Sequence, residues 1–359
     1  MQPLNYTNLF TINNILRENI KKAKPYSSAR DEYKGNEGVF LDANENSIGS
    51  ATNDNYNRYP DPLQLEVKKK LAILKGVSTE NIFLGNGSDE PIDLLFRAVC
   101  NPGKDNAIIL PPTYGMYEVS ASLNDIALKE VPLSDSFEMV TENVIKAIDV
   151  NSKLIFICSP NNPTGNSIKA EEIEKVLKIF KGIVVIDEAY IDFTSGKTFL
   201  NKLSNFPNLV ILQTFSKAWG LAALRLGVAY ASKEIIHVLN KIKPPYNINQ
   251  VTQELALEAL SNKIKMDKMV ADIIDQKAKL IEQLSVISFI EKVFPSDANF
   301  ILIKAGDGKS IYDYLVQNKI ITRDRSKVTL CAGCVRISIG TKEENELLVS
   351  VLKKYSPKI

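Results

Sequence analysis

Short runs of branched apolar residues alternate with longer amphipathic stretches between about residues 63 and 255, and this alternation limits the possible fold more than any other feature. The apolar runs predict strands at 81–84, 107–110, 154–158, 183–186, 209–212 and 227–230, and the other stretches predict helices at 63–75, 89–100, 114–123 and 168–180. Strands that alternate with helices form a mostly parallel sheet covered on both faces. We therefore expect an α/β fold that binds ligands at the carboxyl ends of its strands.

The sequence changes in character after about residue 255. Long charged helices extend to about residue 285, and strands at 298–304, 320–323 and 335–339 follow, with helices at 310–317 and 342–355. Thr341 and Glu344 have the spacing of a capping box. We expect a large domain over residues 40–255 and a small α+β domain over 256–359. Segment 1–39, with a helical stretch at 12–24, is expected to join the small domain.

The charge balance argues against a nucleic-acid or membrane partner. Lys and Arg number 44 against 42 Asp and Glu, so the formal net charge is only +2. No apolar run approaches the roughly 18 residues of a membrane span, and the polar start lacks the pattern of a secretion signal. We expect a cytoplasmic protein whose partners are small molecules.

Cys331 and Cys334 have a spacing that could serve zinc binding or redox chemistry. A zinc site normally needs four ligands, and the single histidine, His237, lies far along the chain in a helical stretch. The other cysteines, Cys100 and Cys158, form no second pair. We therefore interpret the pair as a turn before a strand and expect no metal.

Three charged residues follow the predicted strands at the edge where a ligand would bind. Asp187 comes after the strand at 183–186, Lys217 comes after the strand at 209–212, and Arg225 follows eight positions later. Taken singly, each could be a surface charge or a helix cap. Together they suit a cofactor with a ring nitrogen, an aldehyde and a phosphate, and pyridoxal phosphate has all three.

Other strand ends carry polar or aromatic groups with two possible roles. Ser88 and Asp89 follow two glycines at a helix start, where phosphate binds well, although Ser88 could simply cap the helix. Asn162 lies in a loop rich in Asn, Pro and Gly that could be only a turn, or its amide could contact a ligand oxygen. Tyr190 could reach the same pocket, and Tyr114 could lie over a planar ring or pack in the core.

With these segments assembled, the chain resembles the aspartate-aminotransferase-like, fold type I pyridoxal-phosphate enzymes over nearly its whole length. The motifs at 159–165, 187–190 and 216–217, with Arg225, occur in the order and spacing of that family. Five further segments, at 24–26, 41–46, 57–61, 112–117 and 334–340, are similar to the histidinol-phosphate aminotransferases. One departure is Ser47, where many relatives carry proline. The resemblance implies a homodimer.

The resemblance also implies a role for each candidate residue. Lys217 would hold the cofactor through its amine and move the substrate proton, and Asp187 would pair with the ring nitrogen. The other implied cofactor-binding residues are Ser88, Asp89, Tyr114, Asn162, Tyr190, Thr214, Ser216 and Arg225, together with the partner subunit's Tyr59. The implied substrate-binding residues are Tyr26, Asn44, Arg323 and Arg336. Either arginine could instead be a surface charge at a strand end.

The implied reaction is pyridoxal-phosphate-dependent transamination of L-histidinol phosphate with 2-oxoglutarate, which gives imidazole-acetol phosphate and glutamate in histidine biosynthesis. An aromatic or broad-range aminotransferase, or a threonine-phosphate decarboxylase-like enzyme, would keep the cofactor and change the substrate. A pyridoxal-phosphate-sensing regulator would need a fused DNA-binding domain, for which the sequence shows no basic helix-turn-helix stretch.

Overall fold

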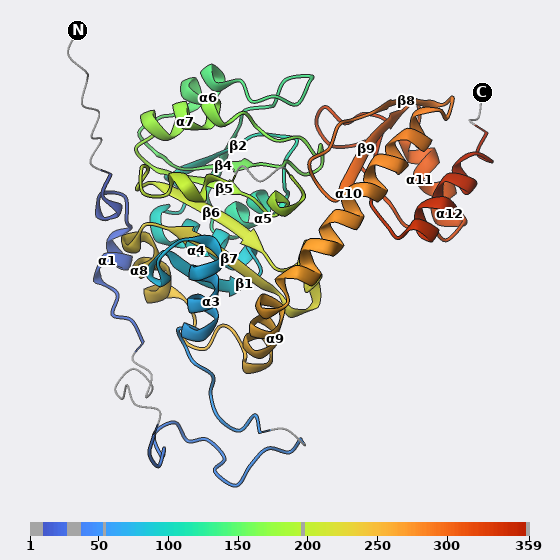
Figure 1. Ribbon diagram of the computed structural model, residues 1–359. Helices are drawn as coiled ribbons and strands as arrows, with labels where there is room; N and C mark the ends of the chain where they lie inside the picture. The colour runs from blue at the N-terminus through green and yellow to red at the C-terminus, as the bar shows by residue number, and fades with distance from the viewer. Residues whose placement is uncertain (1–9, 27–36, 53–54, 195–197, 357–359) are drawn as a thin grey trace.

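The computed structural model describes residues 10–26, 37–52, 55–194 and 198–356 and contains two β-sheets (Figure 1). The larger sheet has seven strands in the order β1-β7-β6-β5-β4-β2-β3, and the smaller has four in the order β10-β11-β9-β8. In Figure 1 the long helix α10 (Lys263–Ser285) runs from the larger sheet towards the smaller one.

The strands of the larger sheet are β1 (Ile82–Asn86), β2 (Asn106–Ile109), β3 (Ala127–Glu130), β4 (Ser152–Cys158), β5 (Ile183–Asp187), β6 (Leu209–Thr214) and β7 (Leu226–Ala231). All neighbouring pairs among β2 to β6 are parallel, which confirms the predicted α/β fold with a mostly parallel sheet. Strand β7 runs antiparallel to both β1 and β6. Its first residues therefore lie at the edge where the other strands end.

Alternate residues of each central strand face opposite layers of the core. In β5, Val184 and Ile186 belong to one buried apolar cluster, and Ile183 and Val185 belong to the other. The first cluster includes residues of α3 (Leu65–Lys75), α6 (Thr141–Ala147), α7 (Ala170–Ile179) and α9 (Gln250–Ser261). The second includes residues of α4 (Asp89–Val99), α5 (Met116–Leu123) and α8 (Lys233–Ile242). Helices therefore cover both faces, and the polar groups at the strand ends are left to form a site.

The described residues 10–22 pack on helices α4 and α8, which cover the larger sheet, contrary to the expectation that the N-terminal helix joins the small domain. Ile12 and Leu16 are buried with residues of α4 and α8, and the backbone N–H of Arg17 bonds to the carbonyl of Ala98 at 3.0 Å. The expected helix at 12–24 is only a 3-10 turn at Ile12–Asn14 and the short α1 (Glu18–Lys22). Two apolar side chains that fill the groove between α4 and α8 decide this placement.

The smaller sheet comprises β8 (Ile290–Val293), β9 (Phe300–Ala305), β10 (Arg323–Asp324) and β11 (Cys334–Ser338). Helices α10, α11 (Gly308–Gln317) and α12 (Lys342–Leu352) share a buried cluster with it. The predicted capping box at Thr341 and Glu344 is confirmed at the start of α12. Cys331 and Cys334 are buried at the turn before β11, where the Cys334 N–H bonds to the Cys331 carbonyl at 2.9 Å.

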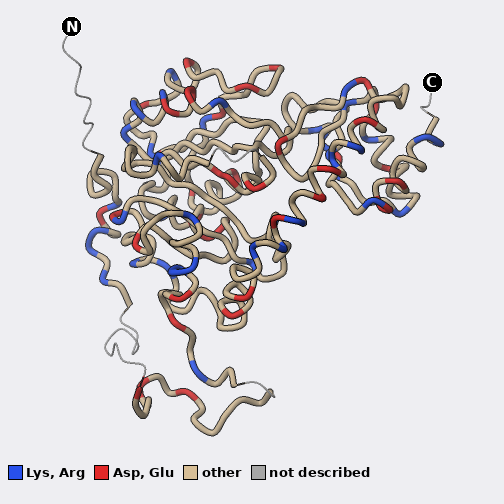
Figure 2. Tube along the Cα trace, in the orientation of Figure 1, with Lys and Arg blue, Asp and Glu red and all other residues tan. Residues whose placement is uncertain are grey.

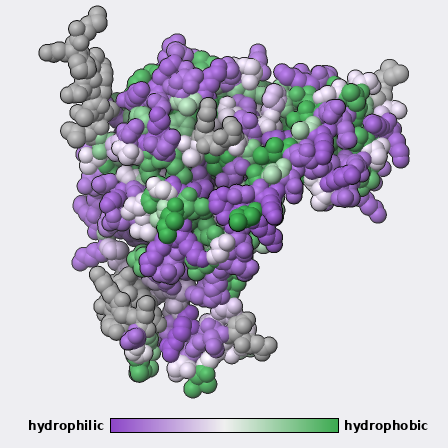
Figure 3. Space-filling view, viewed as in Figure 1, coloured by the Kyte–Doolittle hydropathy of each residue, from purple (hydrophilic) through white to green (hydrophobic). Residues whose placement is uncertain are grey.

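An extended arm formed by described residues between 37 and 60 leaves the body of the molecule (Figure 1). Val39, Leu41 and Ile48 are almost fully exposed on this arm, and Leu41 has an exposed fraction of 82 %. Figure 3 shows apolar surface at the tip of the arm.

Charges of both signs are interspersed over the chain, as Figure 2 shows, in keeping with the net charge of +2. Among the helices that the structure describes, none has the length and apolar character needed to cross a bilayer.

Candidate active site

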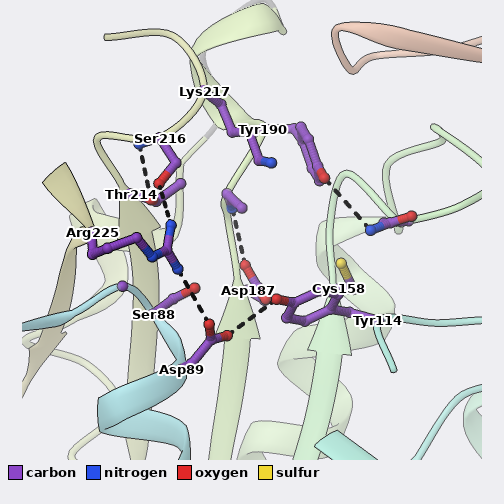
Figure 4. A pocket seen from close by; sticks show the side chains of 13 residues that line it. Ser88, Asp89, Tyr114, Cys158, Asp187, Tyr190, Thr214, Ser216, Lys217 and Arg225 are labelled. Atoms are coloured by element: carbon purple, nitrogen blue, oxygen red, sulfur yellow. Dashed lines mark hydrogen bonds and ion pairs between the residues drawn. The ribbon is translucent and has the colours of Figure 1, made fainter. Parts of the chain in front are cut away.

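A pocket with about 570 Å³ of open space lies where the strands of the larger sheet end (Figure 4). It combines most of the side chains that the sequence placed at strand ends. Its lining residues are Gly87, Ser88, Asp89, Tyr114, Cys158, Asn162, Asp187, Ala189, Tyr190, Thr214, Ser216, Lys217 and Arg225.

Lys217 is the amine of this pocket and lies just beyond β6. The N–H of Ser216 bonds to Oγ1 of Thr214 at 3.0 Å, and the N–H of Gly220 bonds to the Lys217 carbonyl at 3.0 Å, so a tight turn holds the lysine at the strand end. Burial lowers the pKa of the amine, as do the nearby guanidiniums of Arg336 and Arg225, while Asp187 opposes them. These effects increase the fraction of the neutral, nucleophilic amine.

Asp187 forms the floor of the pocket, with 2 % of its surface exposed. The Tyr117 hydroxyl donates to its Oδ2 at 2.8 Å, and the N–H of Ala189 donates to its Oδ1 at 3.0 Å. Burial raises the pKa of this carboxyl to about 6, and the two hydrogen bonds limit the rise. The carboxylate thus remains mostly ionised near neutral pH and can pair with a protonated ring nitrogen.

The opposite side of the pocket is a cradle for an anion. The N–H of Gly87 bonds to the Arg225 carbonyl at 2.6 Å, and Arg225 has a positive φ of 52° that turns its side chain back over the loop. A Cβ on Gly227 would lie 2.2 Å from the Gly87 carbonyl carbon, so the two segments touch through bare backbone. Ser88 stands at the amino end of α4, where the helix dipole favours negative charge.

Asp89 helps to position the groups around this cradle. Its Oδ2 lies 3.5 Å from Nη2 of Arg225, and its Oδ1 accepts a hydrogen bond from the Tyr114 hydroxyl at 3.1 Å. Nη1 of Arg225 also reaches Oγ of Ser216 at 3.5 Å. Figure 4 shows this chain of contacts from Ser216 through Arg225 and Asp89 to Tyr114. The aromatic ring is thereby tied to the phosphate side of the pocket.

Arg336 connects the smaller sheet to the pocket. Its Nη1 donates to Oδ1 of Asn162, and the Nδ2 of Asn162 reaches the Tyr190 hydroxyl at 3.5 Å. The guanidinium also lies over the ring of Phe300, 5.2 Å from its centroid. Arg336 therefore stands at the pocket rim with its cationic group already oriented.

The remaining predicted residues lie outside this pocket in the single chain. Arg323 is directly opposite Arg336 in the β10–β11 ladder, and Tyr26 is 70 % exposed. Asn44 and Tyr59 line another pocket, where the Tyr59 ring stacks on Tyr246 with 4.4 Å between centroids. The partner-subunit role of Tyr59 and the substrate roles of Tyr26 and Asn44 stay predictions.

Sequence reasoning assigned no role to two buried residues that touch the site. Cys158 lines the pocket, and Tyr117 supports Asp187 from below. Tyr117 follows Tyr114 by three positions at the start of α5, so a helical reading would have placed both on one face. Glu188, beside Asp187, points away and accepts bonds from Thr198, Gln213 and the N–H of Phe199.

The sequence matches the family described as aminotransferase class I and II over residues 30–352. The chain belongs to this family. The histidinol-phosphate aminotransferase of Cytophaga hutchinsonii is 61 % identical to this class I and II aminotransferase over 96 % of the chain and 99 % of the relative. The histidinol-phosphate aminotransferase of Christiangramia forsetii is 53 % identical over 96 % of the chain and 98 % of the relative.

Several solved structures share the fold of this chain. The histidinol-phosphate aminotransferase of Clostridium acetobutylicum superposes with a TM-score of 0.77 at 27 % identity, covering 83 % of this chain and 90 % of that one. The histidinol-phosphate aminotransferase of Sinorhizobium meliloti, solved with pyridoxal-5'-phosphate, also has a TM-score of 0.77. Its identity is 22 %, and the match covers 87 % of this chain and 89 % of that one. The L-threonine-O-3-phosphate decarboxylase of Porphyromonas gingivalis superposes with a TM-score of 0.70 at 22 % identity, covering 83 % of this chain and 90 % of that one.

Pyridoxal phosphate is the cofactor of this aminotransferase family, and the residues of the pocket fit it. Three features match its three functional groups: the amine of Lys217, the buried carboxylate of Asp187, and the cradle of Ser88 and Arg225. Because Gly87 and Gly227 touch through bare backbone, neither residue puts a side chain into that cradle.

Proposed function

We propose that this aminotransferase transfers the amino group of L-histidinol phosphate to 2-oxoglutarate, giving imidazole-acetol phosphate and glutamate, a reaction of histidine biosynthesis. The observation that carries the proposal is that the Lys217 pocket opens onto Arg336, a preset guanidinium for an anionic substrate tail. The relatives that are 61 % and 53 % identical over nearly the whole chain support the same substrate.

The bound cofactor supplies an electron-accepting ring next to the substrate Cα. Lys217 would hold the cofactor and, as general base, would take the proton from the substrate Cα and deliver it to the cofactor carbon that bears the aldehyde, which is why a lowered amine pKa matters. Asp187 keeps the ring nitrogen protonated. Asn162 and Tyr190 would contact the ring hydroxyl, and Tyr114 would stack on the ring. The residues that would surround the phosphate are Ser88, Asp89, Thr214, Ser216 and Arg225.

Arg336 binds the substrate tail, with help from Arg323 across the ladder. A guanidinium accepts carboxylate and phosphate alike, so one site can serve both halves of the reaction. Tyr26 and Asn44 complete the substrate site from the segments that precede the sheet.

We also propose that two copies of the chain form a homodimer through the extended arm. Exposed Leu41 and its apolar neighbours would be covered by the second copy, and the partner subunit's Tyr59 would reach the cofactor phosphate. The four cysteines are free thiols, which suits a reducing compartment, and we place the enzyme in the cytoplasm. We divide the chain into a large domain over 40–255 and a small domain over 256–359.

Two measurements test the reaction. The purified protein should show the visible absorbance of lysine-bound pyridoxal phosphate, and Lys217→Ala should lose both this band and turnover, by at least about a hundredfold. Initial rates should then be compared for histidinol phosphate, phenylalanine and threonine phosphate, with carbon dioxide release recorded for the last. An enzyme inactive on histidinol phosphate, or one that decarboxylates threonine phosphate, would refute the proposed substrate.

A further inference from the structure

Three arginines share one face of the small sheet beside the active site. Arg323 in β10 lies directly opposite Arg336 in β11. Arg325 comes two residues after Arg323, and its N–H bonds to the Cys334 carbonyl at 2.9 Å, so it continues the same ladder. Because side chains alternate along a strand, those of Arg323 and Arg325 project to the same side as that of Arg336.

The protein supplies no counter-charge for this arginine face within the described residues. None of the three guanidiniums forms an ion pair there, and the only side-chain hydrogen bond found for them joins Arg336 to the neutral amide of Asn162. Like charges placed together on a sheet are destabilising, and a half-buried cation without a partner is costly. An arrangement of this kind is stabilised when an anion binds.

Arg325 is the least satisfied member of the face. Its side chain is half-buried, and its Nε is buried without a hydrogen-bond partner. Burial, together with the guanidiniums of Arg336 and Arg323, lowers the pKa of Arg325 to about 10. The neighbouring Asp324 does not neutralise it, because its Oδ1 accepts from the N–H of Ser326 and its side chain alternates to the other face.

Arg325 shares the sheet face of Arg336, which contacts the pocket residue Asn162. The positive charges of Arg336 and Arg325 both lower the pKa of the Tyr190 hydroxyl, against a larger rise caused by burial. Tyr190 lines the pocket, so the field of Arg325 reaches the space beside Arg336 where a substrate tail would lie. Among the described residues, Arg325 is the one arginine of this face that is half-buried and has no side-chain hydrogen bond or ion pair, since Arg323 is exposed and Arg336 bonds to Asn162.

We propose that Arg325 is a substrate-binding residue that, with Arg336 and Arg323, selects substrates whose tail is a phosphate dianion over substrates whose tail is a single carboxylate. This inference rests on the proposed function and deepens it. A phosphate monoester offers three acceptor oxygens and up to two negative charges, whereas a carboxylate offers two oxygens and one charge. The third guanidinium therefore gains contacts only with the phosphate.

The test compares Arg325→Gln with wild-type holoenzyme. The kcat/KM for histidinol phosphate should fall about ten- to a hundredfold, mainly through KM, because one charge-assisted contact is lost. The kcat/KM for glutamate, whose tail is a single carboxylate, should change less than about threefold. Inorganic phosphate, used as a probe in calorimetry with the holoenzyme, should bind more weakly to the variant by a factor similar to the loss in kcat/KM.

Two further variants make the result decisive. Arg97→Gln removes an exposed arginine of α4 that pairs with Asp93 at 2.8 Å, and it should leave all these constants unchanged. Arg325→Lys keeps the charge without the planar fork, so its kcat/KM for histidinol phosphate and its phosphate affinity should lie between those of wild type and Arg325→Gln. It replaces the glutamine variant in the test if that variant does not fold. The cofactor absorbance reports whether each variant is loaded.

Equal losses with histidinol phosphate and glutamate, or unchanged phosphate binding, would overturn the role of Arg325. A wild-type enzyme that does not turn over histidinol phosphate would instead overturn the proposed function. In that case the phosphate titration still decides whether Arg325 binds a dianion.

Discussion

The hydroxyl of Tyr117 donates a hydrogen bond to Oδ2 of Asp187 at 2.8 Å, and both side chains are buried beneath the pocket. This contact favours the ionised carboxylate, whereas burial of the carboxylate raises its pKa to about 6. The balance between the two effects places the titration of Asp187 just below neutral pH.

Tyr117→Phe should raise the pH below which the cofactor-free protein loses affinity for pyridoxal phosphate. A hydrogen bond to a charged acceptor contributes about 1.5–3 kcal/mol, so its loss should raise the Asp187 pKa of the cofactor-free protein by about one to two units. Titrations of the apoprotein with pyridoxal phosphate from pH 5 to pH 9 test this shift. Tyr230→Phe is the matched control, since the Tyr230 hydroxyl is fully buried without a partner among the described residues. An unchanged pH dependence in Tyr117→Phe would contradict the role of the contact.

Asp187→Asn should stabilise the cofactor-free protein above pH 6 while abolishing turnover. The pKa of Asp187 is raised from 3.8 to about 6, so the folded state holds this proton more tightly than the unfolded state. The stability gained from this tighter proton binding is complete below pH 3.8 and is lost as pH rises through about 6. The ionised Asp187 therefore lowers the free energy of unfolding at higher pH by about 3 kcal/mol relative to the protonated form. Urea unfolding of the apoprotein at pH 5 and pH 8 should show a larger gain at pH 8. Asp272→Asn, on the exposed side of α10, should show no such difference.

Gly227→Ala should weaken pyridoxal phosphate binding and lower the melting temperature. The new methyl would lie 2.2 Å from the Gly87 carbonyl carbon and 2.3 Å from the Ser88 N, so the phosphate loop must move. Overpacking of this kind costs about 1–3 kcal/mol. Cofactor titration and thermal unfolding measure the two effects. Gly115→Ala is the control, because its Cβ would meet nothing within 4 Å; equal effects of both changes would refute the argument.

Leu41→Asp should dissociate the proposed dimer. A charge on the apolar arm would have to be buried against the second copy, which is unfavourable without a partner for it. Sedimentation velocity over a range of concentrations should show a shift to monomer, accompanied by weaker cofactor binding. Val150→Asp changes an equally exposed valine on the body of the molecule and should leave the assembly unchanged. A monomeric wild-type protein would refute the dimer itself.

The strand ends that form the site could be predicted from sequence because buried parallel strands are nearly continuous apolar runs. The run that ends at Asp187 and the run before Lys217 both became central strands, and their charges meet in one pocket. Strand β3 was missed because it is a partly exposed edge strand of sequence ALKE, which lacks an apolar run.

Contacts between distant segments could not be predicted in the same way. Arg325 is one of several charged residues in a short polar stretch, and only its pairing opposite Cys334 shows that it shares a face with Arg336. The N-terminal segment was misplaced for a similar reason. Ile12 and Leu16 are apolar enough for either core, and the choice depends on the groove between α4 and α8.

The reversed direction of β7 constrains how this enzyme can evolve. Strand β6 ends at Thr214 and β7 begins at Leu226 on the same edge of the sheet, so the short loop between them contains both Lys217 and Arg225. Substitutions within this loop change single side chains, but an inserted or deleted residue would alter the distance along the chain between the amine of Lys217 and Arg225, the proposed phosphate-binding residue. We expect sequence drift at this bend without change in its length.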